Sequence, residues 1–281
     1  MRLDEATAPP PSPPAMAATR SKTRDVLALL VRRDLAVKYQ DSALGYLWSL
    51  LEPLGMALTY WFVFGVIYHS DGNGLPLHVV VGVFAWMWCQ SAIAESTRAL
   101  SSQATLITTI KAPRAIFPLG RVVARFAEYV AGIPIIVAFA IIFARYAHTG
   151  WNLLWLPAAI GLQFIVLSGI ALVLASVNVM YSDVERMMRV VTRIMFYTAP
   201  IVYPLTRITG VHGHGGLPPM GVRIYELNPF VGIFQMHHAA WETGEVVPGS
   251  LVWKAVIGSV IVLVIGWWTF HKLESTVLKE L

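Results

Sequence analysis

Side chains able to do acid–base or metal chemistry are few in this sequence. The stretch 207–249 holds four histidines, which are His212, His214, His237 and His238. Imidazole nitrogens bind transition metals, but HGHGG at 212–216 is too rich in glycine to hold ligands in place. We therefore predict no metal site. The carboxylates Glu226 and Glu242 are predicted to be isolated, whereas acid–base catalysis needs such groups to converge.

The chain lacks the sequence motifs of nucleotide hydrolysis and of ion pumping. No GxxxxGK[ST] phosphate-binding loop occurs, so hydrolysis of ATP by that route is excluded. Neither His-Glu-x-x-His nor a paired-cysteine metal motif is present. Ionisable residues do not line the middle of the apolar segments, as they do in ion-coupled pumps. If the chain drives transport, we expect the energy to come from another protein.

Two residue groups could contact a large polar ligand. Basic residues that suit phosphate gather beside a tyrosine at Arg32, Arg33, Lys38 and Tyr39. Aromatic rings, whose flat faces suit sugar rings, recur within the apolar segments. The candidates are Tyr60, Trp61, Phe64, Tyr68, Trp86, Trp88, Phe196, Tyr197 and Tyr203. The alternative, which fits most of them, is that these rings face lipid or pack in the interior.

The composition is that of an integral membrane protein. Hydrophobic residues make up 56% of the 281 residues, charged residues only 13%, and the mean hydropathy is +0.61; soluble proteins have about 25% charged residues. The net charge of +5 arises in loops between apolar segments, so we predict no nucleic-acid partner. Cys89 is the only cysteine, which excludes an internal disulfide, and we expect it to be a small buried residue.

We predict an all-α membrane fold with six transmembrane helices. The predicted spans are 48–69, 75–94, 116–145, 151–180, 190–206 and 250–271. An amphipathic helix over 25–41 should lie at the membrane surface, with Asp34 and Lys38 paired on its face. Residues 1–24 are predicted to be a disordered cytoplasmic tail. Pro200 and Pro204 should end the fifth span early and leave irregular backbone lining a cavity.

The connecting segments fix the expected orientation. Loops at 95–115 and 181–189 fall on the side of the termini, and re-entrant helices are expected within 207–249 on the opposite side. Among the 21 Lys and Arg residues, only Arg145, Arg207, Arg223 and Lys254 fall opposite the termini. The positive-inside rule therefore places both termini in the cytoplasm.

Four stretches together resemble ABC-2 type permeases that export polysaccharides. They are RDLAVKYQDSALGYLWSLLEPL (33–54), ATLITTIKAPRAIFPLGRVVA (104–124), YSDVERMMRVVTRIMFYTAPIVYP (181–204) and LNPF (227–230). The resemblance covers nearly all of the chain after residue 25. It is closest to exporters of lipid-linked O antigen, teichoic acid or cell-wall galactan, and the arginine content is similar to that of actinobacterial galactan exporters.

This resemblance implies a transport subunit, not an enzyme, in a bacterial inner membrane. It implies a homodimer with two copies of a nucleotide-binding subunit that holds ATP and Mg, and a lipid-linked polysaccharide as substrate. The aromatic residues above would line the pathway, Arg32, Arg33, Lys38 and Tyr39 its entrance, and 207–249 its outer gate. The residues contacting the ATPase would be Arg98, Lys111, Arg114, Asp183, Glu185 and Arg186. Glu52 departs from the neutral residue expected before the proline.

Two alternatives remain open. An ABC-2 permease for drugs or small lipids would have a more aliphatic pathway and would not need the basic helix. A membrane enzyme acting on lipid-linked sugars would need acidic or metal-binding residues at one interface, and the sequence does not predict such a group.

Overall fold

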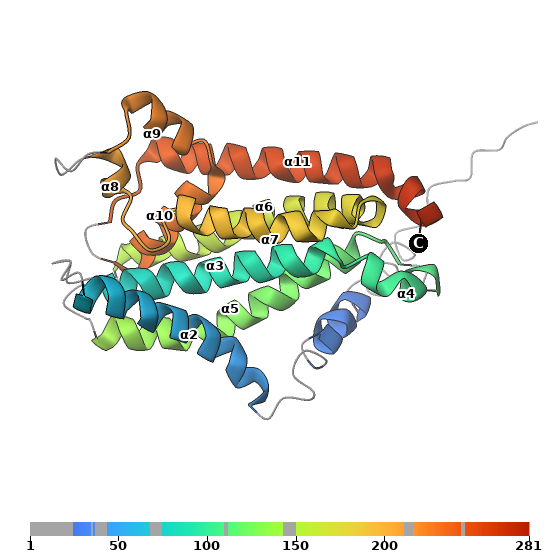
Figure 1. The fold of residues 1–281 in the computed structure, drawn as a ribbon, viewed down its shortest axis with the longest axis horizontal. Helices are drawn as coiled ribbons and strands as arrows, with labels where there is room; N and C mark the ends of the chain where they lie inside the picture. The colour runs from blue at the N-terminus through green and yellow to red at the C-terminus, as the bar shows by residue number, and fades with distance from the viewer. Residues whose placement is uncertain are drawn as a thin grey trace, which may run out of the picture.

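The computed structural model describes residues 25–34, 36, 44–67, 75–109, 112–142, 150–210, 216–242 and 245–280. Within these ranges the secondary structure is helical and contains no strand, which confirms the all-α prediction. Most helices run roughly along the long axis of the molecule (Figure 1). The predicted tail 1–24 and several predicted site residues, namely Lys38, Tyr39, Tyr68, Lys111, His212 and His214, lie outside the described residues.

In the part of the chain that the structure describes, four helices are long and apolar enough to cross a membrane. They are α3 (Leu75–Thr97), α5 (Ile116–Ile142), α6 (Trp155–Met180, preceded by the 3-10 turn η5, Trp151–Leu154) and α11 (Gly249–Glu280). Their mean hydropathies lie between 1.6 and 2.3. They coincide with the predicted spans 75–94, 116–145, 151–180 and 250–271, because long uncharged runs are the strongest sequence signal of a span.

Two further helices flank α3. The helix α2 (Trp48–Trp61) follows the 3-10 turn η1 (Gly45–Leu47) and continues as the π-helix η2 (Phe62–Ile67), close to the predicted 48–69. The helix α7 (Asp183–Thr198) ends before Pro200, as predicted, but the predicted loop 181–189 is wrong, since α7 already begins at Asp183. Acidic Asp183 and Glu185 in its first turn favour this start through the helix dipole.

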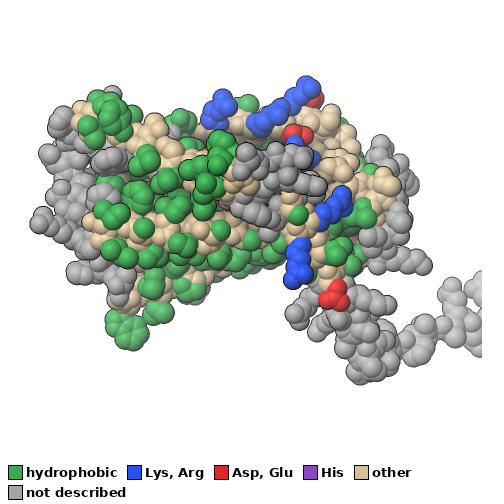
Figure 2. All heavy atoms as spheres, turned by 90° about the horizontal axis from the view of Figure 1, so that it is seen from below, with side chains coloured by type: hydrophobic (Ala, Val, Ile, Leu, Met, Phe, Trp, Pro, Cys, Tyr) green, Lys and Arg blue, Asp and Glu red, His purple; other side chains and the backbone are tan. Residues whose placement is uncertain are grey.

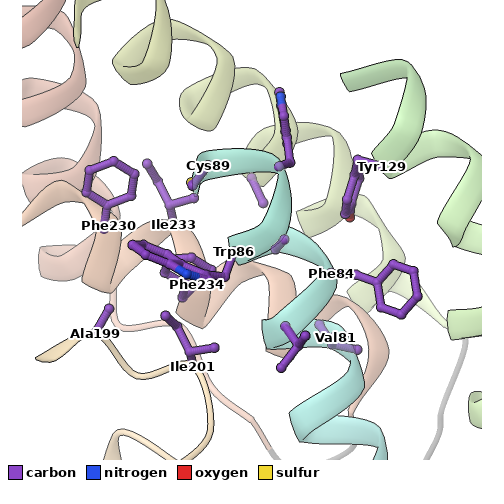
Figure 3. Close-up of a cluster of buried hydrophobic side chains, with 14 of the residues drawn as sticks. Val81, Phe84, Trp86, Cys89, Tyr129, Ala199, Ile201, Phe230, Ile233 and Phe234 are labelled. Atoms are coloured by element: carbon purple, nitrogen blue, oxygen red, sulfur yellow. The ribbon is translucent and has the colours of Figure 1, made fainter. Parts of the chain in front are cut away.

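The helix α3 occupies the centre of the core, between α2 and α7 (Figure 1). Trp86 and Cys89 on α3 are buried together with Phe230, Ile233 and Phe234 of α10 (Pro229–Trp241) (Figure 3). Every residue of α10 from Phe230 to Trp241 is buried. Asn228 precedes the helix as its N-cap residue, and its side chain accepts a hydrogen bond from the Phe230 N–H.

The irregular backbone after α7 is buried. Ala199, Ile201 and Val202 belong to the same core as α3. A Cβ atom on Gly82 would overlap the Ile201 carbonyl, so α3 and this segment meet backbone to backbone. The prediction that this backbone lines a cavity is therefore wrong. The backbone after α7 is shielded from lipid because it packs inside the protein.

The remaining short helices lie towards the two ends of the bundle. At one end are the 3-10 turn η3 (Ser101–Gln103) and α4 (Ala104–Thr109); at the other are α8 (Thr206–Thr209) and α9 (Pro219–Tyr225) (Figure 1). The N-terminal helix, residues 25–34, packs at the α4 end. Its Leu30 is buried with Leu100, Phe117 and Phe270, so its apolar face contacts protein.

Helices α6 and α11 are in direct backbone contact. A Cβ atom on Gly169 would lie 2.5 Å from the Val262 carbonyl oxygen, and one on Gly266 would lie 2.7 Å from the Cα of Gly169. Small residues allow such an approach in membrane helices, where close packing and not the hydrophobic effect holds helices together.

Charged side chains gather at one end of the molecule, which we call the basic end. On the face shown in Figure 2, the visible Lys and Arg side chains lie from the middle to the right of the molecule, and hydrophobic side chains gather on the left half among other side chains and backbone. The arginines of this end are Arg98, Arg114, Arg121, Arg125, Arg186, Arg189 and Arg193. The C terminus lies at the same end (Figure 1).

Candidate functional site

A cavity of about 460 Å³ opens between α2, α3 and α7, towards the basic end. Its walls combine aromatic, charged and sulfur-containing side chains. They include Glu52 and Met56 of α2, Trp86, Gln90 and Thr97 of α3, Arg98 just beyond it, and Glu185, Arg189, Arg193, Phe196 and Tyr197 of α7. This size and mixed lining are typical of a ligand site.

The aromatic wall is formed by residues far apart in sequence. The rings of Trp86 and Phe196 lie 5.9 Å apart, and those of Phe196 and Tyr197 lie 5.1 Å apart at 86°. The Trp86 indole N–H donates to the Gln90 side-chain oxygen at 3.1 Å, which fixes its orientation. Tyr197 is 61% exposed, so its ring is available for a ligand or a second protein surface.

The charged wall joins α7 to the end of α3. Glu185 lies 3.9 Å from Arg98 and 3.9 Å from Arg189, so one carboxylate serves two arginines. Arg189 and Arg193 are one helical turn apart and both line the cavity. Glu52 lines this cavity as well as a smaller one beside Arg125 and Glu128. The mouth therefore carries more positive than negative groups, as an anionic ligand requires.

Of the nine predicted pathway aromatics, the structure brings three into this cavity, which are Trp86, Phe196 and Tyr197. Trp88 packs against Phe126 at 5.0 Å and donates its N–H to the Val122 carbonyl. Tyr203 lies beyond α7, where its hydroxyl donates to the Tyr197 carbonyl at 3.1 Å. Tyr60, Trp61 and Phe64 belong to α2 and η2, but their side chains are not among the described features.

An ion-pair network joins the N-terminal helix to the bundle. Asp34 lies 3.1 Å from Arg121 of α5, and Glu95 of α3 lies 3.7 Å from Arg121 and 3.3 Å from Arg125. Arg125, also paired with Glu128, has only 1% of its side chain exposed. A second cavity, of about 220 Å³, lies against this network and against Arg33. From the sequence, Asp34 was predicted to pair with Lys38, because these two residues are one turn apart on the same helix. The structure pairs Asp34 with Arg121 of another helix instead.

The predicted ATPase-contacting residues lie at the basic end. Arg114 is 2.7 Å from Glu274 of α11, and Asp183 is 3.7 Å from Arg186. Arg98 is paired with Glu185 as described above. Of the predicted entrance residues, Arg32 and Arg33 are exposed on the N-terminal helix. Whether these residues contact substrate or ATPase stays a prediction.

The opposite end contains a buried polar cluster. Glu242 accepts from His78 at 3.0 Å and from His238 at 2.9 Å, and Glu226 is 2.6 Å from Lys254. The prediction that both carboxylates are isolated is wrong: His238 lies four residues before Glu242, and the partners His78 and Lys254 come from other helices. His78, the α3 member, was overlooked, although a histidine within an otherwise uncharged span is itself a signal.

The neighbouring histidine makes a separate set of contacts. His237 donates from Nε2 to the Gln163 side-chain oxygen at 2.7 Å, and its Nδ1 lies 3.4 Å from the Tyr129 hydroxyl. Gln163 in turn donates to the Ala85 carbonyl and to the sulfur of the buried Cys89. This set links α10 to α3, α5 and α6.

Comparisons with known proteins place the chain in a family. Residues 25–236 match the family model described as ABC-2 type transporter. Because this match covers most of the sequence, the chain belongs to the ABC-2 type transporter family, and the resemblance found in the sequence is confirmed. In this family the membrane permease generally works with a nucleotide-binding subunit.

Individual relatives carry more specific names. The chain is 32% identical over 181 residues to the O-antigen export system permease protein RfbA of Klebsiella pneumoniae, covering 64% of this chain and 69% of that protein. It is 23% identical to the protein of the same name from Myxococcus xanthus over 76% and 82% of the two chains. The polysialic acid transport protein KpsM of Escherichia coli is 22% identical, over 89% and 94%.

Proposed function

We propose that this chain is the permease subunit of an ATP-driven exporter that moves a lipid-linked polysaccharide out of the cytoplasm. The observation that carries the proposal is the cavity between α2, α3 and α7, in which aromatic rings and arginines face the same space. The names of the relatives, which refer to O antigen and polysialic acid, support the same class of substrate.

The chemistry of the cavity favours a glycan joined to a phosphate. An exposed aromatic face such as that of Tyr197 suits the apolar faces of sugar rings. Guanidinium groups such as those of Arg189 and Arg193 suit phosphate oxygens. The second candidate, export of drugs or small lipids, is less well supported, because aliphatic contacts alone would serve it and these arginines would cost desolvation energy.

The proposed assembly is a homodimer with two nucleotide-binding subunits that hold ATP and Mg. The helices α2 with η2 and α7 complete six membrane spans, with both termini in the cytoplasm of a bacterium. The gathering of Lys and Arg at the basic end supports this orientation in the inner membrane. Exposed apolar side chains on α7, such as Val190 and Ile194, leave a surface for the second copy.

In this assembly the nucleotide-binding subunits contact the basic end. The N-terminal helix and α4 lie there with the start of α7. ATP binding would shift these elements, and the paired spans α2 and α7 of the two copies would then separate. The energy derives from nucleotide binding that favours one of two states of the dimer.

The test uses the full chain reconstituted with its nucleotide-binding subunit in proteoliposomes. Tyr197→Ala should lower outward movement of the lipid-linked glycan several-fold, with assembly and basal ATP turnover retained, because this ring is 61% exposed. Trp253→Ala, which removes an exposed ring of α11, is the matched control and should export normally. Export by Tyr197→Ala at the rate of the control would refute an aromatic pathway.

A second arm separates the two candidate substrates. The proposal expects lipid-linked glycan, but not the lipid phosphate without glycan, to change the rate of ATP turnover. An equal response to both would favour small-lipid export.

A further inference from the structure

Three ionisable side chains are buried together at the end opposite the basic end. His78 comes from the first turn of α3, His238 from α10, and Glu242 follows α10 directly. Their exposed fractions are 4%, 0% and 8%. Neither the family match nor the names of the relatives assigns a role to this cluster.

The hydrogen-bond geometry determines how many hydrogens the cluster holds. His238 Nε2 lies 3.1 Å from the Pro200 carbonyl, which can only accept, so Nε2 must carry a hydrogen. His238 Nδ1 lies 2.9 Å from one Glu242 oxygen, and His78 Nδ1 lies 3.0 Å from the other. Each of these two contacts also needs a hydrogen. Two neutral imidazoles and a carboxylate supply two hydrogens, whereas the three contacts need three.

The cluster therefore binds one additional proton. This proton lies between His238 Nδ1 and Glu242, as an imidazolium beside a carboxylate or as a neutral pair, and the net charge of the cluster is zero in both forms. Neutrality agrees with burial, because an uncompensated charge here would cost several kcal/mol. The proton also gives the Pro200 carbonyl its hydrogen-bond donor.

A metal ion is the other ligand that such residues suggest, since the ligand atoms lie within 4.8 Å of one another. The ring geometry opposes it. The His78 and His238 rings are stacked at 3.6 Å and 6°. Imidazole lone pairs lie in the ring plane, so lone pairs in parallel planes cannot converge on one ion. The same stacking opposes a second extra proton, because two stacked imidazoliums would repel each other.

Other ionisable side chains lie near the cluster. Glu245, which accepts a hydrogen bond from Gln235 at 2.6 Å, adds negative potential at His78 and His238. His237 lies beside His238 in sequence but is engaged with Gln163 and Tyr129. From the segment after α7, the Tyr203 backbone interacts with His78.

We infer that His78, His238 and Glu242 form a buried proton-binding site whose single proton fastens α10 and the segment after α7 to α3. With the proton bound, α3, α10 and the irregular segment after α7 are joined through Glu242 and Pro200. When the proton leaves at alkaline pH, the Pro200 carbonyl or the Glu242 carboxylate loses its donor, and the segment is released. When a second proton enters at acid pH, the stacked rings separate. This inference does not depend on the proposed substrate.

The substitution Glu242→Gln tests whether the cluster holds this proton. In Glu242→Gln the amide oxygen can accept from His78, while the amide N–H donates to His238 Nδ1 and His238 Nε2–H donates to Pro200. Every contact is then satisfied by neutral histidines. The variant thus replaces the labile proton by a covalently bound hydrogen.

The experiment follows hydrogen exchange of residues 229–241 and Tm of the full chain in lipid nanodiscs across neutral and alkaline pH. Exchange is corrected for its intrinsic pH dependence. The wild type should lose protection of α10 as pH rises, while Glu242→Gln stays protected and Glu242→Ala is unprotected throughout. Identical pH profiles for wild type and Glu242→Gln would overturn the inference. So would a Zn²⁺-dependent rise in Tm that chelation reverses and Glu242→Gln abolishes.

Discussion

Asp34 and Arg121 lie 3.1 Å apart, although one belongs to a helix at the edge of the bundle and the other to a membrane-spanning helix. Glu95 shares Arg121 and also faces the buried Arg125. Its helix, α3, lines the large cavity through Trp86 and Gln90. These charge pairs therefore connect the N-terminal helix to the helix that forms one wall of the cavity.

A double-mutant cycle on this pair measures the connection. Asp34→Ala, Arg121→Ala and the double variant should give a coupling free energy of about 1–3 kcal/mol, because the two side chains are mostly buried. Thermal unfolding provides the measurement, and export per ATP should fall in each single variant. The exposed pair Asp183 and Arg186 serves as control, with coupling close to zero. Equal coupling in the two pairs would contradict the role given to Asp34.

Asp34 also gives a pH-dependent prediction. Burial raises the pKa of Asp34 and outweighs the opposing effect of Arg121. A raised pKa means that the folded protein binds the proton more tightly, so this stabilisation is present at low pH and is lost as pH rises. Asp34→Asn should therefore have a Tm equal to or above that of the wild type at neutral pH. The difference should shrink as the pH falls towards about 4.

The control for this prediction is Asp183→Asn, whose side chain is 79% exposed and which should lower Tm only slightly, through loss of a favourable charge at the start of α7. A neutral-pH Tm for Asp34→Asn well below that of the wild type would show that the ion pair with Arg121 outweighs burial.

Arg193 tests the charged wall of the cavity. Arg193→Gln removes a guanidinium from the lining and keeps a polar side chain of similar reach. Loss of a charge-assisted hydrogen bond to phosphate costs about 1.5–3 kcal/mol, so half-maximal stimulation of ATP turnover should need about 10- to 100-fold more lipid-linked glycan. Arg223→Gln, on exposed α9, should leave the value unchanged. An unaltered value for Arg193→Gln would place the phosphate elsewhere.

Gly266 tests the contact between α6 and α11. Gly266→Val should prevent the two backbones from meeting and should destabilise the protein by about 1–3 kcal/mol or more, as overpacking does. The measurement is the Tm and the yield of monodisperse protein in detergent. Gly161→Val is matched to it, since a Cβ at this α6 position meets no atom within 4 Å. Similar losses in both variants would indicate a general intolerance of valine.

Those parts of the fold that follow from local hydrophobic runs were predictable from the sequence. The spans at α3, α5, α6 and α11 agree with the prediction because a bilayer demands long uncharged helices. The end of α7 agrees because Pro200 cannot continue a helix. The start of α7 was missed because its charges were interpreted as a loop, although acidic residues also favour a helix N-terminus.

The candidate site was only partly predictable. Trp86, Phe196 and Tyr197 were chosen as aromatics in apolar helices, but the same criterion selected Trp88, which packs between α5 and α6. Which face of α3 meets the cavity depends on helix rotation, and α3 is apolar on all sides. The pairs Asp34–Arg121 and His78–Glu242 join residues far apart in sequence, so only the tertiary structure brings them together.

The two adjacent histidines of α10 bear on how the end opposite the basic end can open. His237 is bonded towards Gln163, and His238 towards Glu242 and Pro200. A helix held through consecutive residues in two directions can neither rotate about its axis nor slide along it without breaking both sets of bonds. Widening at this end must therefore either break these hydrogen bonds or leave α10 fixed to α3, α6 and the segment after α7.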